Sequence, residues 1–501
     1  MKLAESDSLA LLTDQYQLTM AYSYWKTGRS EMESVFHLFF RRQPFGGGFT
    51  IASGLEAVIE FINGFKYSES DIEYLSSLCG SDGQRLFDPN FFDYLREMRF
   101  TCDISAVPEG TAVFPYEPLV TVKGPLLQCQ LLETPLLNLI NFPTLIATKA
   151  ARLRLSAQDD EVIEFGLRRA QGIDGGVTAS RAAFVGGCDS TSNVLAGKLF
   201  GIPVRGTHSH SWIMSFDQEI DSFYAFAKAL PSNCIFLVDT YNSIEGVKNA
   251  IEVGKSLREN GKEMLGIRLD SGDITYLSQQ SRKMLDDAGF QDAKIVASND
   301  LDEYLVAEMK YQGSKVDIWG VGTSLVTAKD QSALDGVYKL SAIRENSKQP
   351  WEYRLKVSEQ ISKITNPGIL QVRRFFEEGE FIADVIYDVN TDISNGCILI
   401  DPIDSTRQRY IPPDALGEDL LVPIFKQGKC VYNTPSLTDI RNRTLSQLSF
   451  FHTGVKRFVN PHQYVVGMES SLYELKMKLI REARKKVNPN YEGPITHRHP
   501  K

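Results

Sequence analysis

The sequence has few histidines, few cysteines and no cysteine motif. Only seven residues of each type occur among 501, and no two cysteines have the CxxC spacing of a zinc or redox site. An odd number of scattered cysteines is not typical of a disulfide framework. We therefore expect free thiols, mostly in the core, and a reducing cytoplasmic location.

Long apolar runs and excess positive charge are also absent. The longest apolar stretch, residues 126–147, is interrupted at Gln128, Gln130, Glu133, Asn138, Asn141 and Pro143, so we do not expect it to span a bilayer. The N-terminal MKLAESDS lacks the apolar core of a signal peptide. A net charge of -9 indicates no nucleic acid or membrane partner, because binding to either would release few counterions. Anionic ligands must therefore meet local arginines.

The chain is expected to divide into three parts. Its length exceeds that of one ordinary core, and 43% hydrophobic with 23% charged residues is typical of a folded protein. Residues 1–137 mix helical and strand patterns, including a helix starting near Thr13 or Asp14 and a strand at ESVFHLFF. Residues 346–501 suggest a small β layer (VIYDV, GCILI, VPIFKQGKCVY) followed by a basic amphipathic helix.

Residues 138–345 alternate short apolar runs with helical patterns, as βα units do. The runs are VIEFG (162–166), IPVRG (202–206), CIFLVDT (234–240), MLGIRLDSGD (264–273), AKIVASND (293–300) and DIWGVGT (317–323). Six units favour an irregular (β/α) barrel over a doubly wound sheet. Ligands gather at the carboxyl ends of the strands in both architectures.

One such end carries GTHSHSW, with His208 and His210 one residue apart. An HxH pair at a barrel strand end is typical of many metal-dependent hydrolases. A zinc site of that kind needs further histidines on later strands, and none occurs between His210 and His452. A magnesium site made of carboxylates stays open.

The other strand ends carry groups suited to phosphate. Arg168 and Arg169 follow the first run, Arg268 lies in the fourth, and Ser298 and Asn299 end the fifth. GVGTS follows the sixth with backbone N–H groups and a hydroxyl. Each group has an ordinary alternative, since a lone arginine often forms a surface salt bridge and GVG is often a tight turn. Asp239 is either a ribose or magnesium contact or a helix cap. Clustering on consecutive strand ends favours a phosphate site.

These residues resemble the nicotinate phosphoribosyltransferase family over most of the chain. The shared motifs, in order, are TDQYQLTM (13–20), FFRRQPFGGGF (39–49), EFGLRRAQGIDGG (164–176), GGCDSTSNVLAGKLFGIPV (186–204), GTHSHSW (206–212), VDTYNS (238–243), GIRLDSGD (266–273), ASNDLDE (297–303), GVGTSLVTA (320–328) and GVYKL (336–340). The resemblance implies an irregular α/β barrel and a second, α+β domain in which residues 346–501 pack against residues 1–137. It also implies a homodimer with a shared active site. It implies that nicotinate and phosphoribosyl pyrophosphate (PRPP) form nicotinate mononucleotide and pyrophosphate, the first step of NAD salvage from nicotinic acid. ATP would be hydrolysed through a phosphohistidine, with Mg²⁺ as cofactor.

The resemblance also implies residue roles. His210 is the implied phosphoacceptor, and a neutral imidazole is a competent nucleophile. Phe165 and a partner-supplied Tyr16 would stack on nicotinate while Arg268 binds its carboxylate; ordinary core packing is the alternative for both aromatic residues. Asp239 and Asp270 are implied to be catalytic and Asp273 to bind metal; the other implied substrate contacts are Arg168, Arg169, Thr207, Ser211, Ser298, Asn299, Gly320, Gly322 and Thr323. His208 departs from the family pattern, and we expect it to tune His210 or to line the barrel mouth.

Two rival functions stay open. A related phosphoribosyltransferase for nicotinamide or quinolinate would use the same residues. A noncatalytic barrel that binds a nucleotide is the rival from another class, and the complete set of His210, Arg168, Arg268 and GVGTS argues against it.

Overall fold

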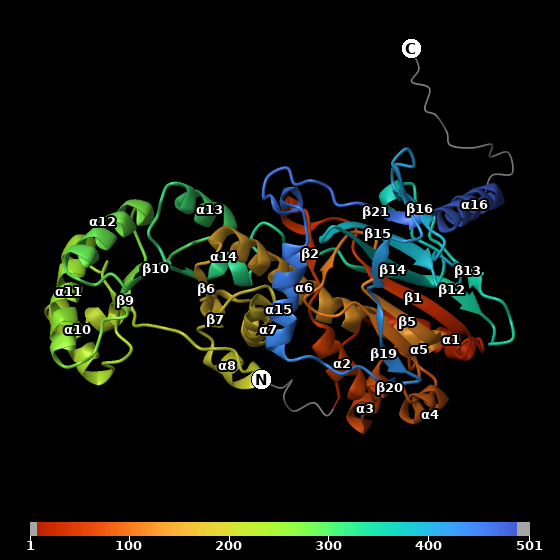
Figure 1. Cartoon of the computed structure of the whole chain (residues 1–501). Helices are drawn as coiled ribbons and strands as arrows, with labels where there is room; N and C mark the ends of the chain where they lie inside the picture. The colour runs from red at the N-terminus through yellow and green to blue at the C-terminus, as the bar shows by residue number, and fades with distance from the viewer. Residues whose placement is uncertain (1–7, 488–501) are drawn as a thin grey trace, which may run out of the picture.

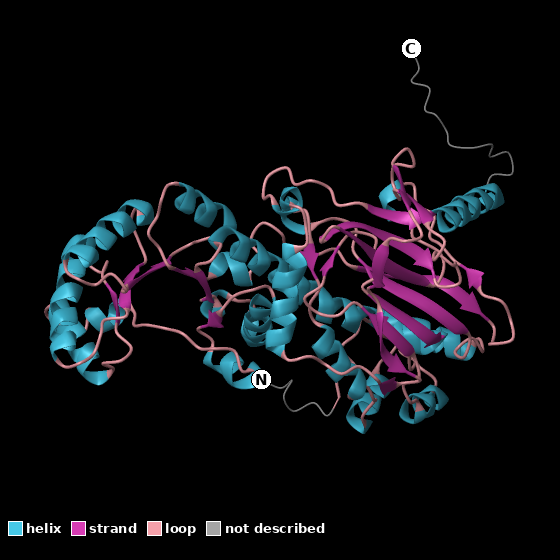
Figure 2. Ribbon diagram, viewed as in Figure 1, coloured by secondary structure: helices cyan, strands magenta, loops and turns pink. Residues whose placement is uncertain are grey.

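The computed structural model describes residues 8–487, which fold into two lobes (Figure 1). One lobe is built on a parallel sheet and lies at the left of the view. The other is rich in antiparallel strands and lies at the right (Figure 2). Among the described residues, no helix combines the length and hydrophobicity that a membrane span requires.

The larger sheet of the right-hand lobe has seven antiparallel strands. In spatial order they are β13 (Glu352–Tyr353), β12 (Val337–Arg344), β1 (Glu33–Phe39), β5 (Val120–Pro125), β3 (Asp103–Ala106), β19 (Val422–Lys426) and β20 (Lys429–Cys430). The last six residues of β1 are all buried, because elements cover both faces of this central strand. Around the sheet lie α1 (Gln15–Lys26), α2 (Leu55–Asn63), α3 (Glu69–Ser77), α4 (Pro89–Glu97), α5 (Leu126–Leu131), the small pair β2 (Thr50–Ile51) and β4 (Ala112–Val113), and the 3-10 turn η2 (Pro44–Gly46).

A second sheet in this lobe is built from the C-terminal segment. Its order is β17 (Gln408–Ile411), β16 (Cys397–Ile400), β21 (Val466–Glu469), β15 (Glu380–Asp388), β14 (Leu370–Glu377) and β18 (Leu416–Asp419), accompanied by α15 (Leu437–Ser449), α16 (Ser470–Val487) and the turns η4 (Ile361–Lys363) and η5 (Thr453–Lys456). Arg374 and Asp384 form an ion pair between its two longest strands, and both side chains are fully buried. Phe381 and Phe451 lie against this guanidinium.

The left-hand lobe is a curved parallel sheet with helices on its outer face. Its order is β7 (Ser190–Thr191), β6 (Glu161–Glu164), β11 (Ile318–Val321), β10 (Lys294–Ser298), β9 (Gly266–Leu269) and β8 (Ile235–Leu237). Every neighbouring pair is parallel. The helices are α7 (Gly172–Val185), α8 (Val194–Phe200), α9 (His210–Ile213), α10 (Glu219–Ala229), α11 (Ser243–Glu259), α12 (Ile274–Asp287), α13 (Glu303–Tyr311) and α14 (Thr323–Val326), with η3 (Leu167–Arg169) after β6. Because β7 and β8 are both edges, we call this unit the half-barrel.

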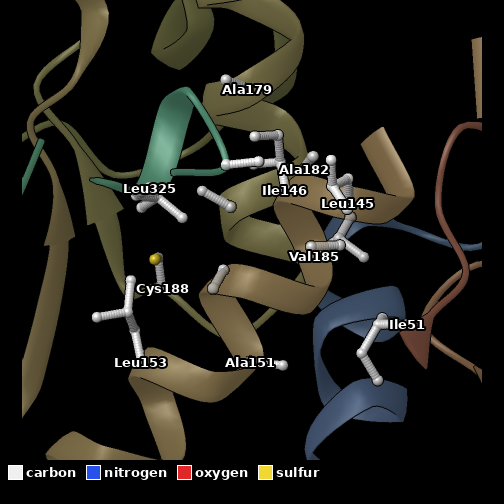
Figure 3. Close-up of a cluster of buried hydrophobic side chains, with 14 of the residues drawn as sticks. Ile51, Leu145, Ile146, Ala151, Leu153, Ala179, Ala182, Val185, Cys188 and Leu325 are labelled. Atoms are coloured by element: carbon white, nitrogen blue, oxygen red, sulfur yellow. The ribbon is translucent and has the colours of Figure 1, made fainter. Parts of the chain in front are cut away.

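One long helix, α6 (Glu133–Ala157), joins the lobes. Figure 3 shows Leu145, Ile146 and Leu153 of this helix in a buried cluster with side chains of α7 and α14. Glu303 at the start of α13 is also fully buried, where it forms ion pairs with Lys149 and Arg152 of α6. These contacts fix the half-barrel against the rest of the molecule.

Most predicted elements are present, with two differences. The run at 202–206 forms only an isolated bridge between Thr191 and Val204, and the sixth strand of the half-barrel is the unpredicted β7. The run VPIFKQGKCVY forms β19 and β20, which belong to the seven-stranded sheet and not to the C-terminal layer. The α/β class is confirmed, but the expected barrel is an open sheet in the described residues. The proposed boundary at 137/138 lies inside α6.

Candidate active site

The carboxyl ends of the half-barrel strands bring together residues that are far apart in the sequence. Phe165 follows β6, Asp239 follows β8, Arg268 and Asp270 lie at the end of β9, and Ser298 ends β10. Pairing in register places these ends along one edge, since Arg268 lies opposite both Leu237 and Val296. This edge forms the candidate active site.

His210 is the first residue of α9 and is held from two sides. Its Nδ1 is hydrogen-bonded to the Thr240 hydroxyl at 3.0 Å, and its Nε2 lies 3.7 Å from a carboxylate oxygen of Asp270. The side chain is 39% exposed, so the ring is oriented by protein groups and is still open to a ligand. Thr240 was not predicted as a site residue, although its place beside Asp239 in VDTYNS could have suggested it.

His208 turns away from this arrangement and into the half-barrel wall. Its ring lies 4.8 Å from that of Phe226, and its Nε2 accepts the N–H of Leu237 at 3.4 Å. Burial lowers the pKa of His208 to about 4, so the ring is neutral near pH 7. Its contacts are those of a packed side chain, and no group of three metal-ligating residues occurs among residues 8–487.

Arg268 links the edge of the sheet to the aromatic ring of Phe165. The guanidinium donates to Ser298 Oγ at 2.9 Å, to Thr207 Oγ1 at 3.0 Å and to Asp270 at 3.0 Å. Its carbon lies 5.9 Å from the centroid of the Phe165 ring. A flat apolar surface and a cation thus lie side by side, which suits a flat aromatic anion.

Asp270 connects the arginine with the histidine. Burial opposes its ionisation, but hydrogen bonds from Ser298 and Arg268 outweigh that effect and lower the pKa of the carboxyl. Asp270 is therefore an anion at neutral pH, and one of its oxygens faces His210.

Asp239 holds the loop that follows β9, which carries Asp270 and Ser271. One carboxylate oxygen accepts the backbone N–H of Asp270 at 2.8 Å and the hydroxyl of Ser271 at 2.6 Å. The other oxygen is buried and has no hydrogen-bond partner. Asp273, by contrast, caps α12 by accepting the N–H of Tyr276 at 3.0 Å, so only two of the three predicted carboxylates belong to the cluster around His210.

The GVGTS segment packs directly against Phe165. A β-carbon added at Gly320 would lie 2.6 Å from Cδ2 of the Phe165 ring, and one added at Gly322 would lie 3.3 Å from the Phe165 carbonyl oxygen. Gly320 is therefore needed for the ring to take this position, whereas Gly322 allows a close approach to the Phe165 backbone. Thr323, the first residue of α14, continues the segment.

The remaining predicted residues lie at the periphery. Arg168 and Arg169 in η3, Asn299 after β10 and Ser211 in α9 are all exposed. The Ser211 hydroxyl is hydrogen-bonded to that of Ser209 at 2.7 Å. Tyr16 is 49% exposed on α1, at the opposite end of the molecule from the half-barrel strands (Figure 1).

Models of one family match most of the chain. The nicotinate phosphoribosyltransferase N-terminal domain matches residues 11–141, the family model matches residues 161–363 and the C-terminal domain matches residues 370–476. The chain belongs to the nicotinate phosphoribosyltransferase family.

Individual members of this family agree with the chain over nearly their full length. The nicotinate phosphoribosyltransferase of Bacillus subtilis is 40% identical, covering 97% of this chain and 98% of the relative. The human enzyme is 36% identical, with coverages of 94% and 97%. The crystal structure of human nicotinic acid phosphoribosyltransferase superposes with a TM-score of 0.81 at 33% identity, covering 93% of this chain and 99% of the other. A nicotinate-nucleotide pyrophosphorylase from Pyrococcus furiosus, with a TM-score of 0.65 and 23% identity over 88% of this chain and 95% of that one, shares the fold.

Proposed function

We propose that this protein transfers the phosphoribosyl group of PRPP to nicotinate, giving nicotinate mononucleotide and pyrophosphate, as the first step of NAD salvage from nicotinic acid. ATP is hydrolysed to ADP and phosphate in the same cycle. Membership of the family and its matches over nearly the whole chain support the reaction. The position of His210, between Thr240 and Asp270 and beside the Arg268–Phe165 pair, is the observation that carries the proposal.

The coupling to ATP is assigned to His210. A ring nitrogen attacks the γ-phosphorus of ATP, an N–P bond forms, and the bond to the bridging oxygen breaks as ADP leaves. Water later cleaves the N–P bond and releases phosphate. Thr240 and Asp270 hold the ring for in-line attack, and the exposed Arg168 and Arg169 are free to meet phosphate oxygens.

Nicotinate is assigned to the surface of Phe165. Its ring would stack on the phenyl ring, and its carboxylate would bind Arg268, which already donates to the carboxylate of Asp270. This cation favours nicotinate over the uncharged nicotinamide, because a partly buried arginine gains more from an anion.

Substitution at the anomeric carbon builds positive charge on the ribose, so nearby carboxylates stabilise the transition state. Asp239 and Asp270, whose contacts join them at the carboxyl ends of the strands, are assigned this role. Mg²⁺ commonly binds one or two carboxylates together with substrate phosphates. The buried and unpartnered oxygen of Asp239 fits such a role; Asp273, also proposed as a metal ligand, would have to share its carboxylate with α12. When bound, the ion would neutralise the leaving pyrophosphate.

The site is proposed to be completed by a second copy of the chain. Helix α1, which carries Tyr16, lies at the opposite end of the molecule from the half-barrel strands (Figure 1), and the ring of Tyr16 is half exposed. A homodimer that places the partner's α1 over the half-barrel would supply it. A cytoplasmic location fits the seven thiols, none of which forms a disulfide.

Competition between bases tests the substrate. Purified protein receives Mg²⁺, ATP and PRPP with equal concentrations of nicotinate, nicotinamide and quinolinate, and the three nucleotide products are quantified. We expect nicotinate mononucleotide to dominate. Preferential use of nicotinamide or quinolinate would move the substrate within the same fold, and no product from any base would favour a noncatalytic nucleotide-binding role.

A further inference from the structure

The interior of the half-barrel is hollow. A cavity of about 670 Å³ runs along the inner face of the strands, whereas barrels of eight strands are filled by layers of side chains. Alternate residues line it where β6 and β10 pass, namely Glu161, Ile163 and Phe165 on β6 and the residue after it, and Lys294 and Val296 on β10. This volume is that of a pocket for an organic ligand and exceeds what a single pyridine ring fills.

The cavity connects the proposed base site with the opposite end of the strands. Phe165 and Thr207 line its upper end, and Thr207 accepts a hydrogen bond from Arg268. Its middle is apolar, with Ile163, Ile235, Val296 and Ile318 forming the wall. A ligand whose head lies on Phe165 can therefore extend only along aliphatic side chains.

The lower rim is charged but balanced. Arg258 pairs with Glu263 at 2.8 Å, Lys294 with Asp317 at 3.4 Å, and Arg205 lies 3.9 Å from Glu161. Each rim cation has a carboxylate partner, so the rim offers no strong site for a further charge. An uncharged chain suits this end best.

We propose that the half-barrel interior is a binding channel for an elongated aromatic carboxylate. The head occupies the proposed site at Phe165 and Arg268, and an uncharged apolar chain runs down between Ile163, Ile235 and Val296. The inference rests on the proposed base site. It adds a second subsite that nicotinate itself does not reach.

Calorimetric binding of three ligands to the full-length protein tests the channel. They are nicotinate and its butyl derivatives at ring carbon 5 and at ring carbon 6, the two attachment points that keep the carboxylate free. At least one derivative is expected to bind more tightly than nicotinate, by up to roughly fourfold for each methylene that becomes buried. Equal or weaker binding of both derivatives, or no binding of any ligand, overturns the proposal.

Variants that fill the channel test whether the added affinity of the butyl derivatives arises inside the half-barrel. Ile318→Phe narrows the middle of the cavity, and Ile235→Phe does so from another strand in case the first variant fails to fold. Both variants are expected to bind nicotinate as the wild type does, but to bind the butyl derivative no more tightly than nicotinate. The matched control Val389→Phe, at an exposed position outside the half-barrel, is expected to keep the tighter binding of the derivative. Retention of the full added affinity in both filled variants overturns the proposal.

Turnover measured on the same preparations separates this inference from the proposed function. A chain-dependent gain in affinity without any nicotinate mononucleotide would leave the channel standing and reject the transferase. Product formation without tighter binding of the butyl derivatives would support the transferase and reject the channel.

Discussion

The close contact between Gly320 and Phe165 predicts that a methyl group added at position 320 will displace the aromatic ring of the base site. In Gly320→Ala the new methyl carbon would lie 2.6 Å and 2.7 Å from two carbons of the Phe165 ring. Ordinary carbon contacts are near 3.5–4.0 Å, so the ring must move by about 1 Å. The backbone of Gly320 has no positive φ, so displacement of Phe165 is the main expected effect.

The cost follows from the stacking that the displaced ring can no longer provide. An aromatic pair contributes about 0.5–1.5 kcal/mol beyond its buried area, which corresponds to roughly a twofold to tenfold rise in the KM for nicotinate. The KM for PRPP should change little, because Phe165 is assigned to the base and not to PRPP. Steady-state kinetics with each substrate varied in turn separate the two effects.

Two further variants test the assignment of Phe165 to the base. Gly175→Ala, where an added β-carbon meets no atom within 4 Å, is the matched control and should leave both KM values unchanged. Phe165→Ala should raise the KM for nicotinate, and adding Gly320→Ala to it should have no further effect, since both act through one ring. A wild-type KM in Gly320→Ala, or additive effects in the double variant, would refute the assignment of Phe165 to the base.

Three other predictions concern the histidine, the acid response and the core. His210→Asn should abolish the phosphoenzyme and ADP formation but retain slow, ATP-independent transfer; labelled phosphate still trapped on this variant would contradict the assignment. Burial lowers the pKa of His37 to about 4, so its neutral form stabilises the fold. The free energy of unfolding should therefore fall by at most about 3 kcal/mol as the pH drops from 6.5 to 4, and His37→Gln should show a smaller fall in urea unfolding. Arg374→Met leaves the fully buried Asp384 without its cation and should cost about 3–5 kcal/mol; Lys248→Met, at an exposed ion pair, should cost less than about 1 kcal/mol.

The sequence predicted the strand ends because the apolar runs and the polar residues after them are local patterns. Five of the six runs in the middle segment form strands, and Asp239, Arg268, Asp270 and Ser298 meet where parallel strands end. The run at 202–206 looked like a strand, but it lies at the open edge of the half-barrel and forms a single bridge. Strand pairing there depends on neighbours distant in sequence, which a local pattern does not contain.

Features that depend on contacts between distant parts of the sequence could not be predicted from local patterns. The contact of His208 with Phe226 follows from how α10 packs on the sheet, and nothing within GTHSHSW distinguishes a packed histidine from one at the site. The pairing of β19 with β3 joins residues more than 300 positions apart. The hollow interior of the half-barrel follows from the strand number and the open edge, neither of which the apolar runs specify.

His210 is proposed to couple ATP hydrolysis to the formation of nicotinate mononucleotide. The most direct measurement incubates the purified protein with Mg²⁺, PRPP and nicotinate, with and without ATP, and quantifies nicotinate mononucleotide and ADP in the same samples. We expect product in both samples, more of it with ATP, and ADP that rises together with the product. ATP that leaves the yield unchanged and forms no ADP would contradict the coupling, and the absence of nicotinate mononucleotide from both samples would contradict the function itself.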